Sequence, residues 1–460
     1  MTSDSLVTAW APYKPTDSAP WTLRRVVHLH RRAGFAAPWQ VLQQDLRDGP
    51  DAAISRVLAG KVNAATTPRD FESLAGTIGD AAVASDNPAR LKAWWVYRML
   101  VAPDPLAERL TLMWHNHFAT SNRKVQNLAL MREQNELFRR HARGNFADLL
   151  SSVVKHPAVL LWLDADSNRK GHPNENLARE LMELFTLGVG HYTEEDVKEA
   201  ARALTGWMVK NRQFRESAAY HDDGEKAILG RGGAWSGDDL VAILVDEPAT
   251  SVRLARRLCE LLMGEGAAEE QAIAELAAGL RERKLNVGWA VQTVLRSAAF
   301  FAEGSIGNRV LAPVEYVVGS VRALEIVEPP PSTMVLAEWM AAMGQDLFEP
   351  PNVFGWAGGR SWINSRSLIA RSNFAQRLAD GSLLSTAGRA DWLALAERCG
   401  CGDNADDFSR FLGQTLWIGR SDEEAKRVKQ TVLGEETSLS PDGSRRLVAT
   451  MLGSAQAQLG

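Results

Sequence analysis

Cysteine is scarce in this chain of 460 residues, which has only Cys259, Cys399 and Cys401. Three cysteines cannot build the disulfide framework of a small secreted protein. Residues 1–20 lack the basic flank, apolar stretch and cleavage site of a signal peptide, and no apolar run approaches the roughly 18 to 20 residues of a membrane helix. The sequence therefore predicts a cytoplasmic protein without a membrane span, although export with a signal-bearing partner stays open.

An excess of positive charge is also missing. The chain has 52 Lys and Arg against 56 Asp and Glu, which gives a formal charge of −4. Proteins that hold nucleic acid by its phosphates need a basic surface, because binding releases the counterions of the phosphates. We therefore expect no nucleic-acid partner.

Alternating runs of Val, Ile and Thr, which mark strands, hardly occur, and the apolar residues recur every three to four positions. We predict an all-α fold, a large irregular multi-helix body with long polar loops. The expected parts are an extended arm (1–22), a main helical domain (23–325), a loop region rich in Pro, Gly and Trp that packs on it (326–380), and a C-terminal helical segment (381–460). All nine histidines precede residue 222, so any imidazole chemistry belongs to the main domain.

The segment from Asp164 to Glu175 has the spacing of a calcium-binding loop. Asp164, Asp166, Asn168 and Glu175 occupy positions 1, 3, 5 and 12, which supply oxygen ligands in an EF-hand. Position 6 is Arg169 instead of the glycine that makes the sharp turn. The sequence thus leaves two interpretations: a loop for Ca²⁺ or a similar divalent cation, or a turn in which Asp and Asn side chains bond backbone amides.

A helix predicted over residues 175–187 has one apolar and one polar face. Glu180 and Glu183 lie on the polar face and can present two carboxylates to one cleft, where a desolvated carboxyl becomes a candidate general acid. Arg179 would then orient an anionic part of a substrate. The alternative is a solvated face of ion pairs.

Two histidines fall on apolar helical stripes, His30 and His117, and should therefore face the interior. A lone histidine in such a place is usually a hydrogen-bonded core residue. Because an unpartnered buried imidazole is costly, we expect both to approach Glu180 and Glu183 in one cleft, as an acid/base centre. His221 lies in a turn crowded with titratable groups and would be a mobile member of this centre, unless the segment is only a polar turn.

Two further segments give local expectations. Thr193 has capping-box spacing to Asp196 and should begin a helix that runs to about residue 206. Trp356 and Trp362 flank a Gly-Gly turn in a rigid loop, where they can stack a sugar, anchor a partner or lie buried under the helical body.

Several blocks together resemble the bacterial family called domain of unknown function 1800. They are RVVHLHRRAGF at 25–35, WHNHF at 114–118, GNF at 144–146, NENLARELMEL at 174–184, the segments 192–193 and 205–207, His221-Asp222, and PPNVFGW at 350–356. The resemblance spans roughly residues 20–380. It implies no established activity. Phe185 stands where many relatives have a histidine, which weakens a metal role for that helix.

Members of that family are often exported and are commonly encoded beside a phosphatase- or sulfatase-like family, domain of unknown function 1501. Two functional hypotheses follow. The first is a hydrolase-like enzyme with a His and carboxylate centre and a bound divalent cation. The second is a noncatalytic helical partner or maturation factor for the phosphatase- or sulfatase-like protein.

Overall fold

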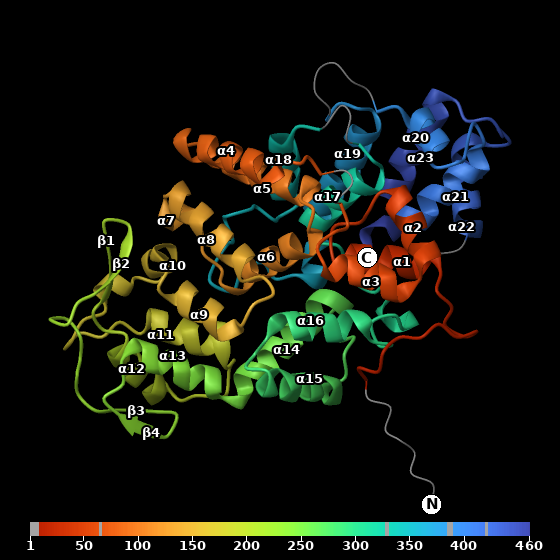
Figure 1. Ribbon diagram of the computed structural model, residues 1–460. Coiled ribbons are helices and arrows are strands. Elements are labelled where there is room, and N and C mark those ends of the chain that lie inside the picture. Colours follow the sequence, from red (N-terminus) through yellow and green to blue (C-terminus); the bar gives the residue numbers. More distant parts are fainter. Residues whose placement is uncertain (1–8, 64–66, 327–330, 384–389, 419–421) are drawn as a thin grey trace, which may run out of the picture.

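The computed structural model describes residues 9–63, 67–326, 331–383, 390–418 and 422–460. Helices make up most of this part, which confirms the all-α prediction. Its strands form two short antiparallel hairpins, β1 (Trp207–Lys210) with β2 (Gln213–Glu216) and β3 (Lys226–Ile228) with β4 (Arg231–Gly233). Both hairpins lie at one end of the molecule (Figure 1).

Helix α6 (Pro105–His117) begins where the sequence supplies a cap. Asp104 accepts a hydrogen bond from the backbone N–H of Ala107, and Pro105 takes the first helical position, where its missing N–H costs nothing. The first helices of the chain are α1 (Leu23–Arg32), α2 (Trp39–Asp48), α3 (Pro50–Leu58), α4 (Phe71–Ala84), α5 (Pro88–Val101), α6 (Pro105–His117), α7 (Asn122–Val125) and α8 (Leu128–Arg140).

The middle of the chain contains a π-helical turn. The helix predicted over residues 175–187 begins as α11 (Asn176–Glu180) and continues as a π-helical turn, η2 (Leu181–Thr186). The other helices are α9 (Phe146–Val154), α10 (Pro157–Trp162), α12 (Glu194–Ala203), α13 (Gly237–Asp246), α14 (Pro248–Met263), α15 (Glu270–Glu282) and α16 (Val287–Arg296).

The last third is helical as well. It contains α17 (Pro313–Ala323), α18 (Thr333–Ala342), α19 (Ser365–Ala379), α20 (Trp392–Arg398), α21 (Ala405–Leu416), α22 (Asp422–Leu433) and α23 (Pro441–Gly453). Short 3₁₀ turns lie at η1 (Ala165–Ser167), η3 (Glu303–Ser305), η4 (Gly359–Trp362) and η5 (Gln456–Gln458). The predicted start of the loop region at residue 326 adjoins residues 327–330, which lie outside the described residues.

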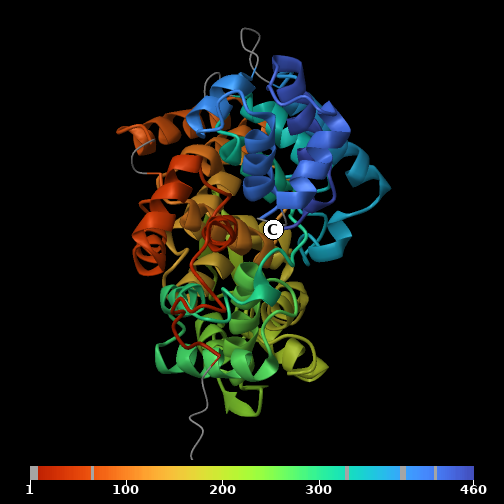
Figure 2. The same cartoon turned by 90° about the vertical axis from the view of Figure 1, so that its right-hand side faces the viewer.

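Two large hydrophobic cores hold these helices. One core is built almost entirely from residues before 302, and the other joins α5 with α17 to α23. In Figure 1 the helices α9 to α16 accordingly lie in the lower half, and the C-terminal helices pack beside α4 and α5 in the upper half; Figure 2 shows the same division from the side. The cores therefore do not divide at residue 326, because an N-terminal helix pair packs on the C-terminal helices.

The N-terminal arm is not detached from the body. Tyr13 donates its backbone N–H to the carbonyl of Arg296, at the end of α16, and its side chain is buried against the first core. Within the described residues, no helix is long and apolar enough to span a membrane.

Thr193 begins α12 as predicted, and the helix ends at Ala203, three residues before the expected end. The Thr193 hydroxyl accepts the N–H of Asp196, and the Asp196 carboxylate accepts the N–H of Thr193 at 2.8 Å. Both halves of a capping box are therefore formed.

We expect Thr193→Ala to lower the free energy of unfolding by about 1 kcal/mol, because it leaves a helix N–H without its acceptor. Urea unfolding followed by circular dichroism measures this. Thr77→Ala, in the exposed middle of α4, is the matched control and should cost nothing, since alanine has the higher helix propensity. Equal stability of Thr193→Ala and wild type would contradict the capping role.

Candidate functional site

The structure pairs His30 differently from the prediction. Its Nε2 lies 2.6 Å from Oδ2 of Asp45, on α2, and both side chains are buried. Burial, with the nearby charges of Arg322 and Arg56, lowers the pKa of His30 to about 3. His30 is therefore a neutral core residue that joins α1 to α2, and it does not meet Glu180 or Glu183.

His117 does reach the predicted helix, but it bonds the backbone there. Its Nε2 donates to the carbonyl of Phe185 at 3.1 Å, and Nε of Arg253 donates to the carbonyl of Leu184 at 2.9 Å. Carbonyls in the last turn of a helix lack intrahelical partners. His117 and Arg253 supply donors to the end of η2, so a structural bond replaces the predicted imidazole–carboxylate pair.

The acidic row itself lies at the surface. Arg179 pairs with Glu175 at 2.9 Å and with Glu194 at 2.7 Å, and Glu183 accepts the hydroxyl of Tyr192 at 2.5 Å. Burial raises the pKa of half-buried Glu180, and Glu183 adds to the effect. Arg179 thus forms the ion pairs of the alternative interpretation, whereas Glu180 and Glu183 form no ion pair with the described residues.

His221 is held by contacts of its own. Its Nδ1 donates to the carbonyl of Thr205 at 2.9 Å, and its neighbour Asp222 pairs with Arg202 at 2.8 Å. These contacts fix the turn that follows β2 onto the end of α12. The predicted polar centre is thus divided among separate structural contacts.

The four predicted calcium ligands have four different partners. Asp164 pairs with Lys124 at 2.8 Å, Asp166 accepts the backbone N–H of Val209 at 2.7 Å, and Glu175 pairs with Arg179. Asn168 is buried and bonds the backbone of Ala201 and Asn174. The segment forms the turn that the sequence left as the alternative. Nowhere in the described part of the chain do three His, Cys, Asp or Glu side chains group as a metal site would require.

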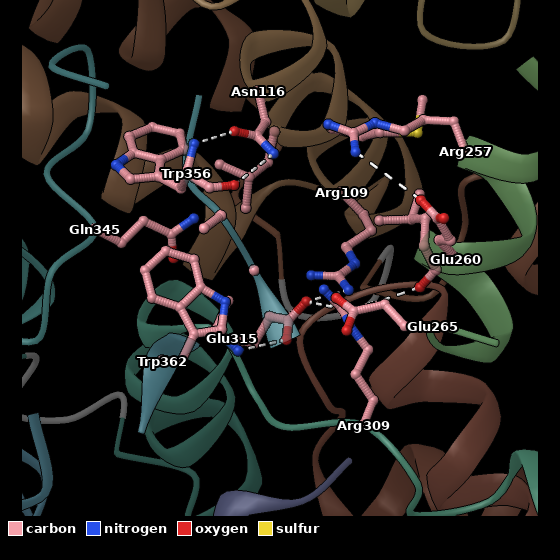
Figure 3. Close-up of a pocket in the computed structure, with 16 residues that line it drawn as sticks. Arg109, Asn116, Arg257, Glu260, Glu265, Arg309, Glu315, Gln345, Trp356 and Trp362 are labelled. Atoms are coloured by element: carbon pink, nitrogen blue, oxygen red, sulfur yellow. Dashed lines mark hydrogen bonds and ion pairs between the residues drawn. The ribbon is translucent and has the colours of Figure 1, made fainter. Parts of the chain in front are cut away.

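A pocket of about 110 Å³ lies between the two cores, and it is the best candidate for a functional site (Figure 3). Its walls come from α6, α14, the start of α17 and the loop before α19. The polar side chains that line it are Arg109, Asn116, Arg257, Glu260, Glu265, Arg309, Glu315 and Gln345. So many charged groups around one small cavity distinguish it from the apolar cores on either side.

Glu315 organises the inner wall of this pocket. One carboxylate oxygen accepts the backbone N–H of Ala312 at 2.8 Å and so caps α17, and the other pairs with Arg309 at 2.7 Å and with Arg109. Burial alone would raise the pKa of Glu315, but Arg109 and Arg309 outweigh it and lower that pKa to about 2. The carboxylate is therefore ionised at neutral pH, although it is only 5% exposed.

Arg257 and Glu260 form the opposite wall, from one face of α14. Their closest nitrogen and oxygen lie 4.0 Å apart, too far for a hydrogen bond. Burial raises the pKa of Glu260, with Glu265 adding to the effect against Arg257. Burial also lowers the pKa of Arg257. In contrast to Glu315, these two groups face the pocket without a strong partner.

The loop containing Trp356 closes the pocket, and Asn116 fastens it to α6. Oδ1 of Asn116 accepts the backbone N–H of Trp356 at 2.7 Å (Figure 3). Gly355 has a φ of 75°, and a Cβ there would lie 2.2 Å from Asn116, so no larger residue fits. Trp356 and Trp362 are 5% and 7% exposed. They form a wall under the helical body and offer no open face for stacking a sugar.

A carboxylate also approaches the Gly-Gly turn of this loop. A Cβ on Gly359 would lie 2.1 Å from an oxygen of Glu265, which follows the end of α14. Glycine therefore lets the loop reach the carboxylate. Glu265 and Glu260 both line the pocket, and Glu265 is exposed at its rim.

Reasoning from the sequence missed most of this pocket. Its charged groups come from positions 109, 257, 260, 265, 309 and 315, and no local motif contains them together. One usable signal was present: α17 is otherwise nearly all apolar, so Glu315 and Arg322 had to be buried with it. Trp356 of PPNVFGW and Asn116 of WHNHF, two of the motifs that carried the resemblance, do line the pocket.

The fold and the pocket define an all-helical protein with a charged internal cavity. The chain belongs to the family described as "Protein of unknown function (DUF1800)", whose sequence model matches residues 28–459. This confirms the resemblance found in the sequence. No curated protein and no solved structure matches the chain.

Replacing Glu315 tests its organising role. We expect Glu315→Gln to lower the free energy of unfolding by about 3 to 5 kcal/mol, because Arg109 and Arg309 would keep buried charges without their carboxylate. Glu270→Gln removes an exposed pair with Arg256 and should cost less than about 1 kcal/mol. Chemical denaturation measures both. A cost for Glu315→Gln no larger than that of the control would contradict this role.

The same carboxylate predicts a dependence on pH. Folding lowers the pKa of Glu315 from 4.5 to about 2, which stabilises the folded state by about 3 kcal/mol. This contribution is complete above pH 4.5 and is lost as the pH falls through 2. Wild type should therefore lose more stability than Glu315→Gln between those values, and parallel losses would contradict the assignment.

Proposed function

We propose that this protein is a hydrolase-type enzyme that transfers protons to and from a small polar substrate in the pocket between α6, α14 and α17. One observation carries the proposal: Glu260 faces the cavity, accepts no hydrogen bond from the described residues, and has a raised pKa. A carboxyl that keeps its proton toward neutral pH is suited to general acid catalysis.

The second carboxyl supplies the complementary role. Glu265 is exposed at the rim, where water has access to it. In hydrolysis, Glu260 donates its proton to the leaving group. Glu265 accepts a proton from the water whose oxygen forms the new bond. The two carboxyls therefore differ in environment as an acid and a base must.

The cavity walls favour an enclosed reaction of this kind. Glu315 fixes Arg109 and Arg309, and Asn116 fixes the Trp356 loop, so the cavity is bounded by side chains with defined partners. Two buried indoles limit the access of water from the loop side. Rigid supporting contacts of this type hold catalytic groups in position.

The noncatalytic partner interpretation remains a hypothesis from the resemblance. It would be favoured by a contiguous apolar surface. The exposed large apolar side chains of the described residues come from separate elements: Leu74, Val189, Tyr220, Val252, Met334, Phe354, Leu368 and Ile369. Only the pair on α19 is adjacent in the chain, so the pocket carries the stronger argument.

A panel of chromogenic phosphate, sulfate, carboxylic and glycosidic esters tests the enzyme proposal. On the substrate that wild type cleaves, we expect Glu260→Gln to lower kcat by about 100-fold or more, because the amide cannot donate the proton. Wild-type kcat should fall as the pH rises through the raised pKa of Glu260. Glu282→Gln, an exposed carboxyl on α15, is the control. Unchanged kcat in Glu260→Gln, or no cleavage of any ester, would contradict the proposal.

A further inference from the structure

Arginine charge exceeds carboxylate charge around the inner end of the pocket. Arg32, Arg109, Arg257 and Arg309 lie close enough that Arg309 lowers the pKa of the other three, in addition to the larger effect of burial. The carboxyl groups that line the pocket with this cluster are Glu315, Glu260 and Glu265. Four guanidinium groups therefore face three carboxyl groups, and one of these, Glu260, has a raised pKa.

Within the described part of the chain, the positive charge of Arg32 is not balanced by a carboxylate in contact with it. Its guanidinium donates to Oδ1 of Asn308 at 2.6 Å and to the carbonyls of Met263 and Ser305, and it has no ion pair among the described residues. Neutral acceptors satisfy hydrogen bonds but do not cancel charge. The folded protein therefore keeps a net positive region at low dielectric, which is costly without an anion.

Several donors of the cluster also lack acceptors. Within the described part of the chain, the buried Nε–H groups of Arg32, Arg109 and Arg309 have no hydrogen-bond partner. Arg109 is only 2% exposed and lines the pocket. Glu315 does not accept from these Nε–H groups. Its oxygens accept the backbone N–H of Ala312 and the terminal guanidinium N–H groups of Arg109 and Arg309. The cluster is therefore short of acceptor oxygens as well as of negative charge.

Arg257 is the member best placed to receive a ligand. It lines the cavity, donates no hydrogen bond to the described residues, and has Glu260 as its nearest carboxylate at 4.0 Å. In Figure 3 its guanidinium extends from α14 toward the centre of the pocket, on the side opposite Glu315. A group bound there would lie between Arg257 and the fixed pair of Arg109 and Arg309.

We propose that this pocket binds a small tetrahedral oxyanion, a phosphate or sulfate group, with Arg257 as its principal ligand. An oxyanion supplies the negative charge that the cluster lacks, and a phosphate monoester is largely dianionic at neutral pH because its second pKa is about 6. Arginine binds phosphate through paired N–H groups, and the N–H groups of Arg257 donate no hydrogen bond to the described residues. The oxyanion would be the anionic part of the substrate. Anion binding itself does not depend on the proposed function, and only the reaction that follows binding rests on it.

Isothermal titration at constant ionic strength tests this inference with four probes: inorganic phosphate, inorganic sulfate, phenyl phosphate and phenyl sulfate. Wild type should bind at least one of them, with one site per chain. Arg257→Gln should weaken that binding by about tenfold or more, because a charged, two-pronged contact is lost. Arg257→Lys should restore only part of it. Arg256→Gln, whose exposed side chain pairs with Glu270 on the outer face of α14, should bind like wild type.

The outcomes are separable from those of the catalytic proposal. Tighter binding of a phenyl ester than of its inorganic anion identifies an esterified ligand, and the reverse identifies the free anion. Glu260→Gln should keep anion binding while losing turnover, so binding that depends on Arg257 stands even if Glu260 is not catalytic. If none of the four probes binds at concentrations up to about 10 mM, any affinity is too weak for a specific site. That result would overturn the inference. Equal binding by wild type and well-folded Arg257→Gln would also overturn it.

Discussion

The buried carboxylate of Glu315 is the contact on which the arrangement of this protein depends. It caps α17, which belongs to the C-terminal core, and it pairs with Arg109 of α6 and Arg309 of the preceding segment. A buried carboxylate is tolerated only with such partners, because desolvation without them costs several kcal/mol. The same three contacts therefore join the two cores and set the inner wall of the pocket at their junction.

Some charged side chains of the pocket are held by ion pairs, and others are free to contact a ligand. Arg109 and Arg309 are held by Glu315, whereas Arg257 and Glu260 lie at 4.0 Å and remain exposed to the cavity. The loop of Trp356, held by Asn116, closes the remaining side. A fixed arginine pair, a less restrained arginine and a protonatable carboxyl thus surround one small space, which is the basis for assigning function to it.

Local signals in the sequence predicted much of the helical architecture and little of the site. Thr193 and Asp104 mark helix starts by short-range chemistry, and both starts are observed. The partners of the two histidines could not be predicted, because burial does not specify a partner: His30 meets Asp45 of the next helix, and His117 meets a carbonyl at the end of a π-helical turn that no sequence period predicts. The pocket joins residues more than 200 positions apart, so only the tertiary structure brings Arg109 to Arg309 and Glu315.

The central claim is that the arginine cluster organised by Glu315 receives an oxyanion. Anomalous diffraction from crystals soaked in tungstate, a heavy tetrahedral oxyanion, tests it most directly. The account predicts one strong anomalous peak inside the pocket, within hydrogen-bond distance of the Arg257 guanidinium. Peaks only at surface lysines or arginines, with none in the pocket, would contradict it.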